Sequence, residues 1–147
     1  MVRRQQQFTV GQPLEKVYRF LSDPAQVGNC LAFVAGTENG REGLRWRVKA
    51  PMSGITGTPE FILDFYARSP GEVRWHGRGA HLETQGHLIL STEGEDTTVV
   101  DFTLEMVALG AMALVIEPMA KVQIEGQMGY FASRLREVLG PQWITVS

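Results

Sequence analysis

The chain has 147 residues and a net charge of −2, with 44% hydrophobic and 20% charged residues. This length fits a single domain, residues 1–147, and the charge gives no sign of a surface for nucleic acid or anionic membranes. The single cysteine excludes an internal disulfide and a cysteine-based zinc site. No apolar run approaches the roughly 18 residues of a spanning helix, and no signal sequence is visible. The sequence therefore favours a cytoplasmic protein without a transmembrane segment.

A first strand is predicted over residues 4–10, followed by two short helices. Apolar residues recur at helical spacing over residues 13–21, after a proline that suits a helix start. Asp23 can cap a second helix, and Pro24 suits its first position. The sequence therefore predicts separate helices over residues 13–21 and 24–31.

Six further strands follow in a closely spaced series. Their short, regular spacing is typical of an antiparallel meander. Alternating apolar and polar residues in LRWRVKA (44–50) and TVVDFTLEM (98–106) predict one covered face and one solvated face. The strands are expected at residues 33–38, 43–50, 54–66, 72–79, 84–92 and 97–106.

The covering element is a long helix predicted over residues 109–139 and ended by Gly140-Pro141. An interior proline, Pro118, predicts a bend near Glu117 or a helix that begins there. The apolar stripe of this helix consists of Ile124, Met128, Phe131, Leu135 and Val138. One long helix on a curved seven-stranded antiparallel sheet is an α+β arrangement.

Strand 72–79 carries two glycines on the face of a tryptophan. In EVRWHGRG, Trp75, Gly77 and Gly79 point to the same side. These glycines either leave a cavity beneath the long helix, or relieve a bent strand and let Trp46 and Trp75 lie flat. The methionines and small alanines in the first half of the helix favour the cavity slightly, because methionine packs adaptably.

The chain resembles the SRPBCC superfamily, whose START-like fold is also called the helix-grip fold. The resemblance covers nearly the whole chain and depends on the element order, FLSDPAQVGNCL (20–31), EVRWHGRG and the closing helix. DPAQVGNCL and VKAPMSGITGTPEF are similar to the family of carbon monoxide dehydrogenase G subunits, and IEPMAKVQIEGQMGYFASRLREVL is similar to the polyketide cyclase/dehydrase family. The resemblance implies that a hydrophobic ligand binds between the long helix and the sheet, above a floor of two short helices.

A binding protein for a small hydrophobic molecule, without catalysis and without a cofactor, is the favoured function. Apolar residues dominate the expected binding site, with a few polar groups to orient the ligand. The sequence leaves a homodimer open. The expected ligand-binding residues are Trp46, Phe61, Trp75, Gly77, Gly79, Phe102, Met112, Met119, Gln127 and Tyr130.

Two alternatives remain open. The first is a polyketide cyclase/dehydratase-like enzyme that uses Glu117 or Tyr130 as the catalytic group. Glu117 either faces the cavity or accepts hydrogen bonds at a helix start. The second is an accessory protein of the same type as the carbon monoxide dehydrogenase G subunits, which would dock through an exposed apolar surface.

Histidines near the fifth and sixth predicted strands raise the possibility of a metal site. The alternation of side chains along the strand argues against it. A turn centred on His81-Leu82 would place His76 opposite His87, near Glu83. His76 alternates with Trp75 and is therefore expected on the solvated face, so no metal is predicted. The lone cysteine, Cys30, is expected to pack as a small hydrophobic residue.

Overall fold

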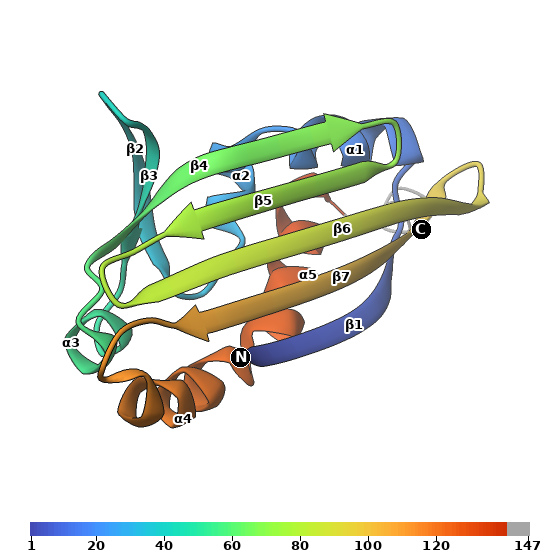
Figure 1. The fold of residues 1–147 in the computed structure, drawn as a ribbon. Helices are drawn as coiled ribbons and strands as arrows, with labels where there is room; N and C mark the ends of the chain where they lie inside the picture. The colour runs from blue at the N-terminus through green and yellow to red at the C-terminus, as the bar shows by residue number, and fades with distance from the viewer. Residues whose placement is uncertain (141–147) are drawn as a thin grey trace.

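A seven-stranded antiparallel sheet wraps around a C-terminal helix in the computed structural model, which describes residues 1–140 apart from the side chain of Phe65 (Figure 1). The strand order is β1-β7-β6-β5-β4-β3-β2, so the first strand pairs with the last. The strands are β1 (Val2–Val10), β2 (Val34–Gly40), β3 (Gly43–Val48), β4 (Glu60–Ser69), β5 (Glu72–Arg78), β6 (Leu82–Gly94) and β7 (Thr97–Ala108). The predicted α+β helix-grip fold is confirmed.

The two short helices between β1 and β2 are α1 (Leu14–Leu21) and α2 (Pro24–Asn29). The Asp23 carboxylate accepts a hydrogen bond from the backbone N–H of Ala25 at 2.9 Å, and α2 begins at the proline that follows Asp23. Pro13 precedes α1, and its carbonyl accepts the N–H of Val17 at 3.1 Å. The predicted pair of helices with a capped restart is therefore confirmed.

Side chains of the sheet form hydrogen bonds with these helices, which lie on its inner face, behind the strands in Figure 1. The indole N–H of Trp46 donates to the Pro24 carbonyl at 3.1 Å. The Tyr66 hydroxyl donates to the Leu21 carbonyl at 2.5 Å. Both bonds satisfy carbonyl groups of the helix segments, so α1 and α2 close one part of the inner face.

The strand predicted over residues 54–66 is wrong up to Glu60, where β4 begins, because the chain first forms a short helix, α3 (Met52–Thr56). Met52 and Thr56 are both buried and lie four residues apart, which places them on one side of a helix. The Thr56 hydroxyl also donates to the Met52 carbonyl at 2.7 Å. Gly57 then ends α3 with a φ of +70°, a conformation that glycine adopts at no steric cost.

The C-terminal helix is interrupted at a different place from the one predicted. It consists of α4 (Ala113–Ile124) and α5 (Gln127–Leu139), and the break falls at Glu125-Gly126. Pro118 lies inside α4, so the helix does not begin at Glu117. Gly126 lies at this break, and glycine weakens a helix by about 1 kcal/mol relative to alanine, which favours an interruption there. Pro141, expected to end the helix, lies outside the described residues.

The core between α5 and the sheet is a chain of aromatic contacts. Trp46 on β3 meets Trp75 on β5 with ring centroids 5.7 Å apart, and Trp75 meets Phe102 on β7 at 5.8 Å. Phe102 packs on Phe131 of α5 at 4.5 Å, and Phe131 packs on Phe8 of β1 at 6.2 Å. These contacts link three alternate strands of the sheet, β3, β5 and β7, to the first strand and to α5.

The alternation predicted for β3 and β7 is confirmed. Trp46 and Val48 are buried, as are Val100, Phe102, Leu104 and Met106. The intervening residues of β7 are partly exposed on the outer face. No helix within residues 1–140 has both the length and the apolarity that crossing a membrane requires.

Candidate functional site

Five of the predicted ligand-binding residues come together at the inner face of the sheet. Trp46, Phe61, Trp75 and Phe102 are fully or almost fully buried there. Gln127 is also buried, and its side-chain oxygen accepts the backbone N–H of Ala32 at 3.0 Å. This glutamine therefore joins α5 to the segment that follows α2.

Neighbouring side chains occupy the space beside the two glycines of the EVRWHGRG segment. A Cβ atom added at Gly77 would lie 2.9 Å from Cγ2 of Thr84, and one at Gly79 would lie 2.4 Å from Cγ2 of Thr58. Cβ atoms in folded proteins do not approach other atoms this closely. The glycines allow these close contacts. The missing side chains therefore leave no cavity beside the strand.

A third glycine, Gly86 on β6, supports Trp75. It lies directly opposite Trp75 in the register, and an added Cβ would come within 2.0 Å of the indole ring. The indole therefore lies flat across the strand at Gly86. We did not predict this residue from the sequence, because its role depends on the pairing of β5 with β6, although the inward alternation of LETQGHLIL was a usable signal.

The remaining predicted residues lie away from the inner face. Met112 is 54% exposed, Met119 is 39% exposed and Tyr130 is 41% exposed. The Glu117 carboxylate pairs with the amino group of Met1 at 2.5 Å, at the start of β1. The structure thus separates both catalytic candidates, Glu117 and Tyr130, from the aromatic core.

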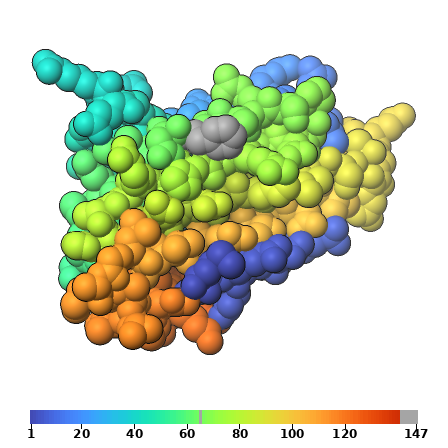
Figure 2. Space-filling model, viewed as in Figure 1, coloured from blue at the N-terminus to red at the C-terminus, as the bar shows by residue number. Residues whose placement is uncertain are grey.

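A groove of about 600 Å³ lies between α4 and the start of β1, which are neighbours in Figure 2. Its lining combines the apolar Met1, Val2, Leu114 and Pro118 with the charged Arg3, Arg4, Glu117 and Lys121. The outward face of α4 is strongly apolar, because Leu114 is 89% exposed and Val122 is 69% exposed. Such a concentration of exposed apolar side chains marks a functional surface more often than a structural one.

Two buried polar atoms on the inner face have no hydrogen-bond partner among the described residues. They are Nε1 of Trp75 and Oγ1 of Thr84, on neighbouring strands. Trp46, by contrast, has its indole N–H bonded to Pro24. A buried polar group without a partner costs about 1–3 kcal/mol, so natural proteins leave few of them.

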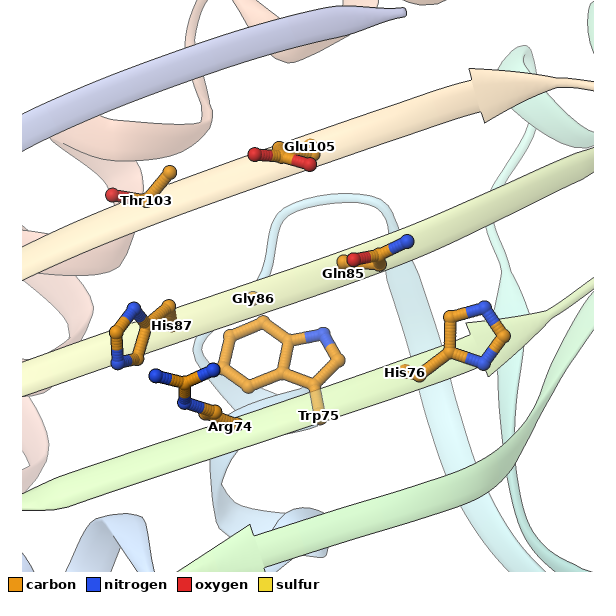
Figure 3. Close-up of a pocket in the computed structure, with 8 residues that line it drawn as sticks. All are labelled: Arg74, Trp75, His76, Gln85, Gly86, His87, Thr103 and Glu105. Carbon is orange, nitrogen blue, oxygen red and sulfur yellow. The ribbon is translucent and has the colours of Figure 1, made fainter.

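The outer face of the sheet is open to solvent (Figure 2). It carries a shallow polar pocket of about 250 Å³ (Figure 3). His76 and His87 flank it, but they are not paired across the strands as predicted. The register places His76 opposite Gln85 and Arg74 opposite His87. The turn between β5 and β6 is centred on Ala80-His81, one residue earlier than predicted, since the Gly79 N–H donates to the Leu82 carbonyl at 2.9 Å; this shift places Gln85 instead of His87 opposite His76.

Both ring nitrogens of His76 face carboxylates. Nδ1 lies 2.5 Å from Asp64, and Nε2 lies 3.4 Å from Glu83. Partial burial lowers the pKa of His76, but hydrogen bonds and charge from Asp64 and Glu83 outweigh it and raise the pKa above its ordinary value. No cluster of three or more metal-binding side chains occurs within residues 1–140.

We expect His76→Gln to destabilise the protein more in acid than in base. A raised pKa means that folding favours the protonated histidine, so its contribution is complete below the ordinary pKa of about 6.5 and is lost as the pH rises through the folded-state pKa. Urea unfolding should show a loss of up to about 1 kcal/mol near pH 5.5, typical of exposed ion pairs, and a smaller loss near pH 8.5. An equal loss at both pH values would contradict this assignment.

Cys30 does not fit the role of a nucleophile. Its side chain is fully buried between α2 and β2. Burial raises the pKa of the thiol to about 11, and the charge of Arg134 lowers it only partly. The thiol therefore stays protonated at neutral pH, whereas the reactive form of a cysteine is the thiolate.

A curved antiparallel sheet wrapped around a C-terminal helix, with two short helices after the first strand, defines the START-like class of protein. A protein from Thermus thermophilus is similar, with a TM-score of 0.70 and 19% identity, over 93% of this chain and 96% of that chain. The Zhui aromatase/cyclase from Streptomyces sp. R1128 is also similar, with a TM-score of 0.68 and 16% identity, over 94% of this chain and 91% of that chain. A START superfamily protein from Mycobacterium smegmatis has a TM-score of 0.65 and 15% identity, over 93% of this chain and 96% of that chain. At these identities the similarity shows the fold alone.

Within this class the sequence identifies a family. The CoxG family, described as the G subunit of carbon monoxide dehydrogenase, matches residues 7–138. The chain belongs to this family, as the segments DPAQVGNCL and VKAPMSGITGTPEF suggested. Comparison with curated proteins gives no match.

Proposed function

We propose that the protein binds a small, largely apolar molecule between α5 and the inner face of the sheet. The aromatic side chains of Trp46, Phe61, Trp75 and Phe102 would surround it, opposite Phe131 of α5. Contact with these rings would remove apolar ligand surface from water, which favours binding by about 25 cal/mol per Å² before ordering costs. The inner face is closely packed in this structure, so entry requires part of the helix to move.

The observation that carries this proposal is the small number of buried apolar side chains in α4. Only Ile116, Ala120 and Ile124 of this helix are buried, and its other large apolar side chains face solvent. A segment with few buried apolar contacts opens at a lower free-energy cost than the rest of the protein. The break at Glu125-Gly126 separates α4 from α5 and would serve as the hinge at which the C-terminal helix bends away from the sheet. Met112 and Met119 would then lie at the entrance.

Binding of 2-methylnaphthalene, measured by titration calorimetry, tests the proposal. We expect saturable binding of one molecule per chain, and no saturable binding would overturn the proposal. The rate of binding, followed by tryptophan fluorescence in a stopped-flow instrument, tests the role of α4. Gly126→Ala should slow binding about five-fold, because alanine favours a continuous helix by about 1 kcal/mol.

Gly129→Ala provides the matched control. Gly126 and Gly129 both have open space where a Cβ would lie, so neither substitution causes a clash. Gly129 lies in the first turn of α5, past the break, and its replacement should leave the binding rate unchanged. Equal rates for the two variants would show that α4 does not control entry.

A further inference from the structure

The two unpartnered polar atoms of the inner face lie at diagonal corners of a four-residue square. In the register of β5 and β6, Trp75 pairs with Gly86, and Gly77 pairs with Thr84. Trp75 and Thr84 therefore occupy one diagonal and the two glycines occupy the other. Diagonal neighbours on one face of an antiparallel pair lie about 7 Å apart, within reach of a long side chain.

The indole ring of Trp75 lies over Gly86, with its nitrogen directed along β6. Figure 3 shows the Trp75 ring across Gly86, with its nitrogen on the Gln85 side of the ring, toward which the chain continues to Thr84. Gly86 allows this position, because any side chain there would collide with the indole. A ligand oxygen that comes within hydrogen-bond distance of both Trp75 Nε1 and Thr84 Oγ1 would satisfy both groups.

The surroundings determine which kind of oxygen is compatible. The buried polar side chains of residues 1–140 are all glutamines or threonines, and none carries a full charge. A charged ligand group would therefore be buried without a countercharge, which is very unfavourable. The indole N–H can only donate, so the ligand atom must accept, and the threonine hydroxyl can donate or accept.

We propose that Trp75 Nε1 and Thr84 Oγ1 form the polar anchor of the binding site, and that its ligand is a neutral apolar molecule carrying a hydroxyl or carbonyl oxygen. This inference rests on the proposed function and specifies the chemistry of its ligand. The oxygen accepts a hydrogen bond from the indole N–H. It forms a second hydrogen bond with the threonine hydroxyl, which can donate or accept. The apolar remainder of the ligand contacts the aromatic chain.

A pair of probes of the same shape tests the anchor, namely 2-naphthol and 2-methylnaphthalene. The wild-type protein should bind 2-naphthol about tenfold more tightly, because only the hydroxyl satisfies the two buried groups. Thr84→Val, which replaces the hydroxyl by a methyl group of similar size, should abolish most of this preference. Thr84→Ser, which keeps the hydroxyl, should retain it.

The unfolding temperature of the ligand-free protein gives a second readout. Thr84→Val should leave it unchanged or raise it, because the substitution removes an unpartnered polar group. Thr98→Val is the matched control, since Thr98 is equally buried but its hydroxyl donates to the Gln12 carbonyl at 2.8 Å. This control should lower the unfolding temperature by roughly 2–4 °C.

The outcomes separate the two proposals. Equal binding of both probes by the wild-type protein, or an unchanged preference in Thr84→Val, would overturn the polar anchor and leave apolar binding standing. An equal decrease in unfolding temperature for Thr84→Val and Thr98→Val would also overturn the polar anchor. It would mean that the Thr84 hydroxyl already has a hydrogen-bond partner in the ligand-free protein. Failure of both probes to bind would overturn the proposed function itself.

Discussion

Replacing Gly86 with alanine is expected to destabilise the protein by about 3 kcal/mol, the upper part of the range for overpacked cores. The added Cβ would lie 2.0 to 2.2 Å from three atoms of the Trp75 indole. The indole cannot retreat, because Trp46 and Phe102 pack against it at centroid distances of 5.7 and 5.8 Å. Equilibrium unfolding in urea would measure the loss.

The collision with Trp75 makes a specific prediction for the double variant. Trp75→Phe removes the part of the ring that meets the new Cβ, so Gly86→Ala should cost much less when combined with it. Gly54→Ala is the control without a collision, since nothing lies within 4 Å of a Cβ at that position. If Gly86→Ala cost the same with and without Trp75, the indole would not be what requires glycine at this position.

Replacing Phe131 with alanine is expected to lower the free energy of unfolding by about 4 kcal/mol. Phe131 is fully buried and connects α5 to the sheet through Phe102 and Phe8. The variant should leave an apolar cavity beneath α5, and such cavities bind small aromatic molecules. Benzene should therefore raise the unfolding temperature of Phe131→Ala more than that of the wild-type protein.

Tyr130→Ala is the matched control, because Tyr130 neighbours Phe131 in α5 but is 41% exposed. Its replacement should change the free energy of unfolding by no more than about 0.5 kcal/mol. Similar losses in the two variants would mean that α5 does not pack on the sheet through Phe131.

The fold could be predicted largely from local patterns. Alternation in β3 and β7, and the Asp23-Pro24 restart, are short-range signals that the structure reproduces. The errors arose where two patterns competed. Residues 54–56 fit the start of a strand, but they belong to α3, whose buried positions Met52 and Thr56 lie four residues apart.

The candidate site was harder to predict, because its key contacts join different strands. The sequence indicated Trp75, Gly77 and their shared face, but not the pairing with Gly86 and Thr84. The presence of an unpartnered indole N–H depends on which neighbours lie within hydrogen-bond distance, and no local pattern contains that information. The exposure of Met112 likewise depends on the exact direction of α4.

The pairing of β1 with β7 has a consequence for the synthesis of this protein. Phe8 lies opposite Val100 in the sheet, so the first strand gains its neighbour only after most of the chain has left the ribosome. Until then its apolar residues and its unpaired backbone groups are available to other chains. Long-range pairing of this kind slows folding. Molecular chaperones that shield the amino-terminal strand should therefore increase the yield of native protein during translation.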